Sequence, residues 1–427
     1  MIIGIDASRA NKTRKTGTEW YSYGLIRLFA QIDKENQYIL YTNEPLTGGL
    51  LDLSDKSYDF NTDVKDKPEV SDGGYQKIKS PFNNFQAKVL KWPFSLFWTQ
   101  GRLSLEMLFN KPDVLFVPSH ALPIIHPKKS IVTIHDIGFD KMDNIYKKEN
   151  IGPANKTSRK ILNAIALIFT LGKYRANTLD YLHWTTEFAL KHAKKILTVS
   201  NFSKQEIVGE YKVDQDKIKV IHNGYNENLY LECTNDIEIN DIAKKYGIKS
   251  PYFLYIGRIE KKKNIAALVE AFAIMRDNVD DKNIKLVLIG SASYGFDEVN
   301  YMIREFGLEH DVIICGWVKE EDLPAIYGGA LAFVFPSVYE GFGIPLLQAM
   351  SCGVPIVASN VSSIPEVVGE AGLLFNPSYV KSIAEAMEEI FNNKELREKL
   401  ILLGKERVKN FSWRKSAEET LKEIVGL

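Results

Sequence analysis

Short apolar runs alternate with amphipathic helical patterns along most of the 427 residues, in two successive series. The first series contains the runs IIGID, YILYT, VLFVP, SIVTIHD, KILTVS and KVIHN. The second contains YFLYIG, KLVLIG, VIICG, AFVFP, PIVAS and GLLF. Strands separated by helices favour parallel, doubly wound sheets. The sequence therefore predicts an α/β chain of two such units in tandem, with a boundary near residues 224–250.

Ligands of doubly wound sheets bind beside the carboxyl ends of the strands, so the loops after the strands are the candidate sites. The first of these loops lacks the GxGxxG pattern of dinucleotide-binding proteins, which argues against a dehydrogenase. The polar stretch from Leu53 to Gly74 has little periodicity, and we interpret it as a loop or insertion.

Charge and cysteine content narrow the class of protein. Lys and Arg together number 54, as do Asp and Glu, so no global basic bias favours a nucleic-acid partner. The three cysteines lack CxxC spacing, which fits a reducing compartment. We find neither a signal-peptide pattern nor an apolar run of about 20 residues. The expected location is the cytoplasm, with the inner face of the membrane as an alternative.

The most informative segment runs from Phe335 to Phe375. Its strand AFVFP leads into a loop that carries Glu340, Phe342 and Gly343, and Pro345 follows at a position suited to the first turn of a helix. Free N–H groups at a helix start favour a diphosphate, and Glu340 can accept hydrogen bonds from sugar hydroxyls. A plain strand–turn–helix corner with a capping glutamate is the alternative.

A second segment, YIGRIEKKKN, places Arg258 and Lys263 after another strand. Arginine binds phosphate oxygens in a bidentate manner and lysine adds a point charge. Two fixed cations there would stabilise a departing nucleoside diphosphate. A solvated basic loop is the alternative, and it is our interpretation of Lys261 and Lys262.

Taken together, these segments resemble the retaining GT-B glycosyltransferases of the "glycosyl transferases group 1" family, also called family four. In that family the GR…KN loop binds the donor diphosphate, which implies this role for Arg258 and Lys263. The first glutamate of its E-x(7)-E motif binds the donor sugar, which implies this role for Glu340. The resemblance implies that the backbone of the loop at Gly17 approaches the donor phosphate or the acceptor. It also implies further donor-binding residues, namely Val318, Phe342, Gly343, Ile344, Leu346 and Gln348.

One position departs from the family pattern. The second glutamate of the motif, which usually holds the donor ribose, is Gln348 here. A glutamine amide still bonds to ribose hydroxyls but lacks the charge-assisted component. We therefore expect weaker donor binding, and reduced activity as the alternative outcome.

A histidine follows a strand of the first series, in SIVTIHDIGF. A lone histidine at a strand end is commonly structural, but the resemblance places His135 near the reacting sugar as a catalytic-site residue. Asp136 is then the structural member that caps or orients it.

The resemblance implies a GT-B fold with a cleft between two Rossmann-like domains. Residues 1–225 would bind the acceptor, 226–412 the nucleotide-sugar donor, and helix 413–427 would return to the first domain. The implied reaction moves a hexose from a GDP- or UDP-sugar to a glycan or lipid-linked acceptor in polysaccharide synthesis. Mannose from GDP-mannose is the first hypothesis. No DxD-like carboxylate cage follows a strand, so we expect neither an essential metal nor a cofactor.

Three alternatives remain open at this point. A sugar-nucleotide binding protein without activity is favoured only by Gln348. An epimerase or a phosphorylase on a similar fold is also compatible, although we find no lysine context for a phosphorylase cofactor.

Two stretches of the first domain mix apolar residues with Lys and Arg, namely KVLKWPFSLFWTQGRL and KTSRKILNAIALIFTLGKYR. Such mixtures suit either a peripheral membrane contact or a buried core helix and packed aromatic residues.

Overall fold

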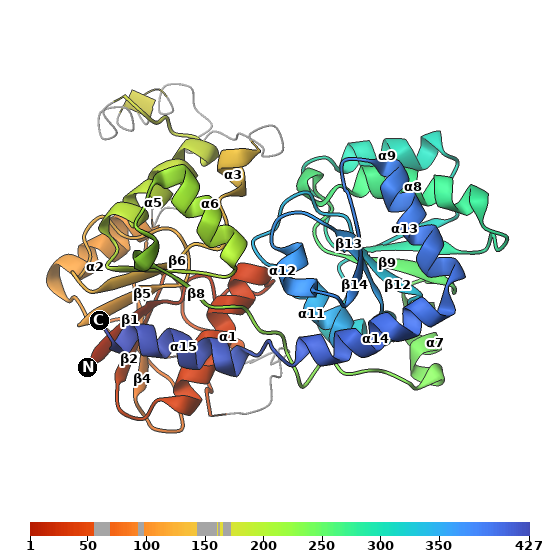
Figure 1. Cartoon of the computed structure of the whole chain (residues 1–427). Helices are drawn as coiled ribbons and strands as arrows, with labels where there is room; N and C mark the ends of the chain where they lie inside the picture. The colour runs from red at the N-terminus through yellow and green to blue at the C-terminus, as the bar shows by residue number, and fades with distance from the viewer. Residues whose placement is uncertain (55–68, 93–97, 143–159, 161–162, 165–171) are drawn as a thin grey trace. The chain divides into compact units, whose positions relative to one another are not determined.

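The computed structural model describes residues 1–54, 69–92, 98–142, 160, 163–164 and 172–427 (Figure 1). Its contacts define two compact units. The first contains Met1–Lys141, the described residues from Lys160 to Asn223, and Trp413–Leu427. The second contains Met142 and Gly224–Ser412. Among the described residues, no helix has the length and apolar character needed to span a bilayer.

The sheet of the first unit has the strand order β3-β4-β2-β1-β5-β6-β7-β8, and all pairs are parallel except β3 with β4. Every strand predicted in this part of the sequence is present, and β3 and β4 were not predicted. The strands are β1 (Ile2–Asp6), β2 (Gln37–Thr42), β3 (Tyr75–Lys77), β4 (Phe85–Val89), β5 (Val114–Val117), β6 (Ser130–Thr133), β7 (Lys195–Thr198) and β8 (Ile218–Val220).

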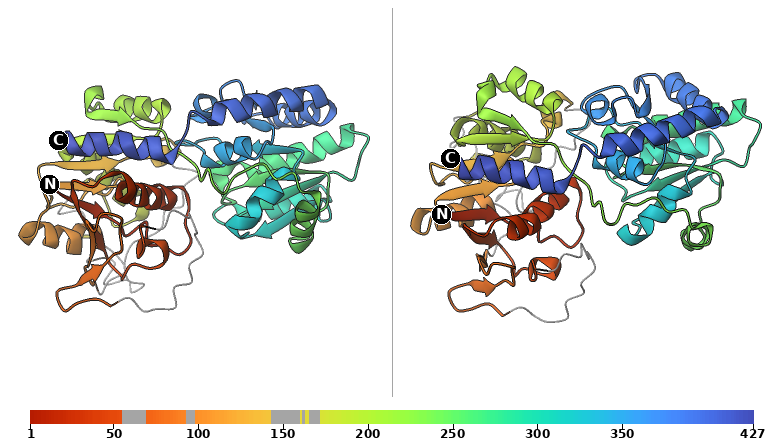
Figure 2. Two further views of the ribbon diagram at one scale, coloured as in Figure 1. Left: turned by 90° about the horizontal axis from the view of Figure 1, so that it is seen from below. Right: turned by 60° about the horizontal axis from the view of Figure 1, so that its bottom comes forward.

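Helices cover both faces of this sheet (Figures 1 and 2). A π-helical segment, Trp98–Leu103, leads directly into α2, and the 3-10 turns η1 (Gly48–Leu50) and η3 (Gln215–Lys217) are short connections. The described α-helices are α1 (Gly17–Ile32), α2 (Ser104–Phe109), α3 (Gly138–Lys141), α5 (Thr178–His192), α6 (Asn201–Tyr211) and α15 (Trp413–Val425).

Helix α1 begins with a capping box that its sequence encodes. The backbone N–H of Thr16 donates to Glu19 at 3.2 Å, and its hydroxyl also bonds to that carboxylate. The inner face of α1 is apolar, and α15 packs against it. The ring of Trp413 lies 6.1 Å from that of Tyr21, and Gly24 leaves space for the indole. Residues 413–427 therefore complete the first unit.

The second unit contains a six-stranded parallel sheet in the order β11-β10-β9-β12-β13-β14. All six of its strands were predicted. They are β9 (Tyr252–Ile256), β10 (Lys285–Ile289), β11 (Val312–Gly316), β12 (Ala332–Phe335), β13 (Ile356–Ser359) and β14 (Gly372–Phe375). β9, β12 and β13 are wholly buried, as expected for strands covered on both faces.

The helices of this second unit lie on both sides of its sheet (Figure 1). The described set is α7 (Asp236–Lys245), α8 (Ile265–Asn278), α9 (Phe296–Glu305), α10 (Leu323–Gly328), α11 (Ile344–Ser351), α12 (Ile364–Val368), α13 (Val380–Asn392) and α14 (Lys394–Val408). The sequence prediction of a strong helix at Ala266–Met275 falls within α8.

Candidate active site

The strand order of the second unit reverses between β9 and β12, which is where a doubly wound sheet opens a crevice. The loops that follow these two strands meet there, because the N–H of Val338 donates to the carbonyl of Lys262 at 3.0 Å. Gly257 directly follows β9, and Gly290 directly follows the neighbouring strand β10. Gly290 has a φ of +139°, and a Cβ at this position would lie 1.9 Å from the carbonyl oxygen of Gly257. Only glycine allows the two segments to approach so closely.

Two residues that lie far apart in the sequence form an ion pair in this crevice. Lys263 Nζ donates to Glu340 Oε1, and the two side chains are 14% and 9% exposed. The ammonium group also lies 5.5 Å from the centre of the Phe335 ring. A buried pair of this kind has a fixed geometry. Removal of one partner would leave the other as a buried, uncompensated charge.

Arg258 lies on the same loop but in a more open setting. Its guanidinium donates to Ser293 Oγ at 3.2 Å and lies 3.8 Å from Glu260. More than half of its side chain is exposed. The guanidinium is therefore accessible to an anion, whereas the ammonium group of Lys263 is largely buried with its carboxylate partner.

Two serines that were not among the predicted site residues, Ser362 and Ser363, form hydrogen bonds with the backbone of the Glu340 loop. Ser363 Oγ donates to the carbonyls of Glu340 at 2.9 Å and Phe342 at 3.2 Å. Ser362 Oγ accepts the N–H of Glu340 at 3.1 Å, with Ser362 itself at a φ of +57°. A polar cluster directly after a predicted strand was the available signal.

The remaining residues of this loop begin helix α11. Gly343 is the N-cap with a φ of +100°, a conformation that favours glycine, and Ile344 is the first helical residue. The N–H of Leu346 bonds to the carbonyl of Gly343 at 3.0 Å. Phe342 and Leu346 bury their side chains, so neither side chain is open to a ligand.

Gln348 lies on α11 and contacts the core. Its Oε1 accepts a hydrogen bond from the hydroxyl of Tyr327 at 3.3 Å, and the same hydroxyl lies 3.4 Å from the carbonyl of Pro345. Burial raises the pKa of Tyr327 well above its ordinary value, so this hydroxyl stays protonated and donates. Val318, two residues beyond β11, is buried.

In the first unit, the strand order reverses between β1 and β5. The loops that follow β1, β5 and β6 carry polar side chains near this point. His135 follows β6, and its Nε2 lies 3.3 Å from the carbonyl of Pro118. The ring of Tyr21 meets it edge-on with centroids 4.8 Å apart. Burial lowers the pKa of His135, so a neutral imidazole is present at neutral pH. Asp136 accepts the N–H of Gly138 at 3.0 Å.

His120, which follows β5, is a second histidine at this edge and was not among the predicted site residues. Burial lowers its pKa to about 4, with the charge of Arg9 adding to the effect. Arg9 in turn pairs with Glu19 at 3.2 Å. Gly17 is exposed at the first position of α1, beside the capping box. His120 follows its strand just as His135 does, so the same signal would have found it.

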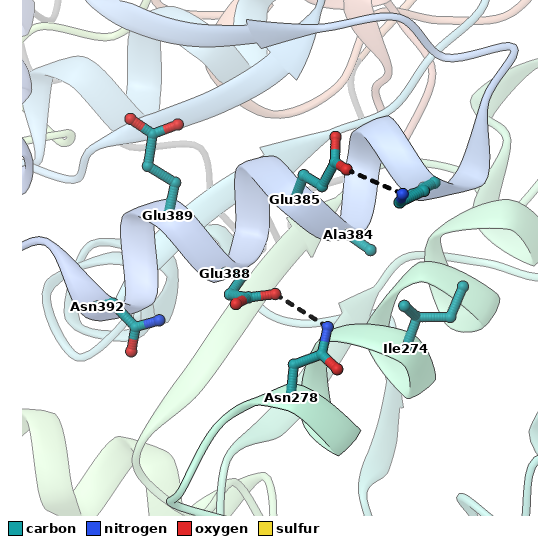
Figure 3. Close-up of a pocket in the computed structure, with 8 residues that line it drawn as sticks. Ile274, Asn278, Ala384, Glu385, Glu388, Glu389 and Asn392 are labelled. Carbon is teal, nitrogen blue, oxygen red and sulfur yellow. Dashed lines mark hydrogen bonds and ion pairs between the residues drawn. The ribbon is translucent and has the colours of Figure 1, made fainter.

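A cavity of about 420 Å³ lies between α8 and α13, away from these loops (Figure 3). Glu388 accepts a hydrogen bond from Asn278 at 3.0 Å, and Glu385 pairs with Lys381. None of the predicted site residues lines this cavity. In the part of the chain that the structure describes, no three His, Cys, Asp or Glu side chains are grouped to hold a metal ion.

Comparison with known proteins agrees with this architecture. The profile of the "Glycosyl transferases group 1" family matches residues 238–407, and that of "Glycosyltransferase Family 4" matches residues 65–229. O-antigen chain mannosyltransferase B from Escherichia coli is 33% identical over 332 residues, which cover 75% of this chain and 82% of that protein. The chain spans 30% of the longer serotype-specific mannosyltransferase WbdA of the same species.

Two solved structures are similar over nearly all of both chains. Sucrose-phosphate synthase from Thermosynechococcus elongatus gives a TM-score of 0.69 at 19% identity, covering 99% of this chain and 98% of that one. HepE from Anabaena, solved with UDP-glucose, gives 0.66 at 15% identity, covering 100% and 99%. The two Rossmann-like units thus define a GT-B fold. The chain belongs to the group 1 family of glycosyltransferases and is a glycosyltransferase.

Proposed function

We propose that this enzyme transfers a hexose from a nucleotide-diphosphate sugar to a glycan or lipid-linked acceptor during cell-surface polysaccharide synthesis. Mannose from GDP-mannose is the first hypothesis for the donor, supported by the name of the 33% identical Escherichia coli relative. The observation that carries the proposal is the buried Lys263–Glu340 pair at the reversal of the second sheet.

In this proposal the second unit binds the donor. The diphosphate lies against Arg258, Lys263 and the start of α11, where the helix dipole favours negative charge. Glu340 accepts hydrogen bonds from the sugar hydroxyls, and Gln348 bonds to the ribose. Backbone groups of Val318, Phe342, Gly343, Ile344 and Leu346 complete the donor site.

The first unit, in this proposal, binds the acceptor. The backbone at Gly17 approaches the bound acceptor, and His135 lies beside the reacting sugar. A neutral imidazole suits hydrogen bonding to a sugar hydroxyl, since it both donates and accepts. The lowered pKa of His135 keeps it in this form at neutral pH.

The reaction would proceed by front-side displacement with retention of configuration. The bond from the anomeric carbon to the β-phosphate oxygen breaks, and a bond to the acceptor oxygen forms on the same face. The acceptor hydroxyl passes its proton to the leaving phosphate oxygen. Catalysis then depends on positioning and on cations fixed before the charge develops, and the proposal includes no divalent ion.

The test is an assay of the purified chain with a panel of GDP- and UDP-sugars, with and without a chelator. Proton NMR of the anomeric signals separates transfer, donor hydrolysis and epimerisation. We expect an α-linked product from an α-linked donor, unaffected by the chelator. Donor binding without turnover would favour a sugar-nucleotide binding protein. A product of inverted anomeric configuration, or epimerisation of the donor sugar in place of transfer, would overturn the mechanism.

A further inference from the structure

A surface of the first unit that contains none of the candidate site residues exposes large apolar side chains. The helical segment of residues 98–109 buries one face through Leu103 and Met107. On its other face Leu105, Leu108 and Phe109 project outward, at the i, i+3, i+4 spacing of a helical stripe. Phe109 is 73% exposed, which is more than any other exposed large apolar side chain of the described chain except Ile237.

A neighbouring loop extends this stripe. Gln100 Nε2 donates to the carbonyl of Leu122 at 3.1 Å, and the N–H of Ile125 lies 3.5 Å from Ser104 Oγ. These bonds hold the loop against the helix, and it exposes two isoleucines there. The α2 surface is defined here as Leu105, Leu108, Phe109, Ile124 and Ile125.

The helix is held firmly in this orientation. Glu106 points inward, where it pairs with Lys88 of β4 and lies 3.3 Å from Arg102. A buried carboxylate with two cationic partners fixes which face of the helix is turned inward, because rotation would expose the pair and bury the apolar stripe. The outward position of Phe109 is therefore a property of the fold.

Lysines lie close to the α2 surface at the amino ends of two neighbouring strands, β5 and β6. Lys111 precedes β5, and Lys128 and Lys129 precede β6, which is the next strand. The carbonyl of Lys129 accepts the N–H of Leu115 at 3.0 Å, so the segments that lead into β5 and β6 lie side by side. All three lysines are exposed, and within the described residues none forms an ion pair. Asp113, an exposed acid close to Lys111 in the sequence, accepts the N–H of Ile2.

We propose that the α2 surface docks on an anionic lipid bilayer. An apolar ridge bordered by cations is what an interfacial helix presents, with the apolar groups entering the headgroup boundary and the lysines meeting anionic lipid. The chemistry distinguishes lipid from a protein partner, because lysine is depleted in protein–protein interfaces, where arginine and aromatic residues predominate. The bordering cations here are all lysines.

This surface refines the sequence-based expectation of membrane contact. Phe94, Phe97 and most of the stretch from Lys156 to Arg175 lie outside the described residues. Trp98 lies within them, and its indole N–H donates to the carbonyl of Leu90 at 3.3 Å. The residues that carry the proposal are instead Leu105, Leu108 and Phe109 of α2, which are exposed in the structure.

The proposal does not depend on the identity of the reaction, and the experiment reads binding without activity. The purified full chain is sedimented with vesicles of phosphatidylglycerol and phosphatidylcholine, and with vesicles of phosphatidylcholine alone. We expect binding to the anionic vesicles that weakens as salt is raised. Phe109→Ser should weaken it at least roughly tenfold, and Lys128→Gln with Lys129→Gln about fivefold for each charge removed.

Leu402→Ser is the matched control, because Leu402 is a similarly exposed apolar residue on α14 of the second unit. It should leave vesicle binding unchanged. Circular dichroism and melting temperature verify that each variant is folded, and Leu108→Ser replaces Phe109→Ser if the latter is not. Failure of the wild-type chain to bind anionic vesicles would overturn the proposal.

Three further results would also overturn it. One is equal binding by the wild-type and α2 variants, which would place the contact elsewhere. Another is equal binding to neutral vesicles, which would remove the role of the lysines. The third is a wild-type dimer in sedimentation equilibrium that Phe109→Ser dissociates, without vesicle binding, which would assign the surface to a second copy of the chain.

Discussion

The candidate site residues of the two units lie in different electrostatic environments. In the second unit, opposite charges from two loops are paired and shielded, as in Lys263 with Glu340. In the first unit, burial keeps the histidines uncharged, since it lowers the pKa of His135 and brings that of His120 to about 4. A fixed pair of charges suits a diphosphate, whereas neutral rings suit hydroxyl groups.

The comparison indicates that substitutions in the second unit should affect charge and those in the first unit should affect hydrogen bonding. A lost charge at a developing anion costs more than a lost neutral hydrogen bond. The variants below are chosen to break this contrast or to sharpen it, in order of the expected effect.

Lys263→Met should have the largest effect. It removes a cation from the predicted diphosphate site, and we expect kcat/KM to fall by about 10²–10³, the range for loss of one charge-stabilising donor. It also leaves Glu340 buried without a partner, so the free energy of unfolding should drop by about 3–5 kcal/mol. Steady-state kinetics and denaturant unfolding measure the two effects.

A double variant separates activity from stability in that experiment. Lys263→Met with Glu340→Gln removes both charges, so stability should largely recover while activity stays low. Lys261→Ala, on the same loop but exposed, is the control that should change neither. Recovery of activity with stability would show that the pair is structural.

His135→Ala should come next. Loss of a hydrogen bond to a group that develops charge is worth roughly 1.5–3 kcal/mol, so kcat should fall about 10- to 100-fold with little change in donor affinity. Because burial lowers the pKa of His135, the neutral form predominates at neutral pH and is lost as the pH falls through that lowered pKa. The acid limb of the kcat profile should therefore change in the variant.

The exposed His310 provides the control, since His310→Ala should alter neither kcat nor its pH dependence. Turnover of His135→Ala within about twofold of wild type, below the range for such a bond, would make this histidine structural.

Ser363→Ala tests positioning rather than contact. It removes the donor to the carbonyls of Glu340 and Phe342, each bond being worth about 1 kcal/mol. We expect the donor KM to rise several-fold, with a smaller effect on kcat. Ser359→Ala is matched in burial and donates to the carbonyl of Phe335, outside the loop. Equal kinetic effects of the two substitutions would refute a specific role for Ser363.

Substitutions of Gln348 should have the smallest effect. Gln348→Glu keeps an acceptor for Tyr327 and adds a charge for the ribose hydroxyls, so donor binding should be preserved or tightened by up to about tenfold. Gln348→Leu should weaken binding by a similar factor. Calorimetric titration of the donor measures both, and identical affinity for all three forms would remove Gln348 from the donor site.

Much of the fold was readable from the sequence because buried parallel strands form continuous apolar runs. Strand β4 was missed for a physical reason. It contains Lys88, which breaks the apolar pattern and is accommodated only because Glu106, 18 residues away, pairs with it inside the fold. A sequence pattern cannot reveal that a charge has a distant partner.

The candidate site follows the same rule. Arg258, Lys263 and Glu340 were predicted because they lie in loops that follow strands. Their different degrees of burial and their partners are visible only in the structure. Ser363 donates hydrogen bonds to two carbonyls, and Tyr327 donates one to Gln348. These bonds join residues that are 21 to 23 positions apart in the sequence. Such bonds depend on where the chain returns in space, so residue type and spacing did not predict them.

The packing of α15 on α1 has a consequence for how the chain is made. Since residues 413–427 belong to the first unit, the second unit is an insertion within the first. A ribosome completes the second unit before it delivers Trp413, the residue that packs on Tyr21 and Gly24. The unit synthesised first is thus the last to mature, with one side of α1 uncovered throughout translation of the other.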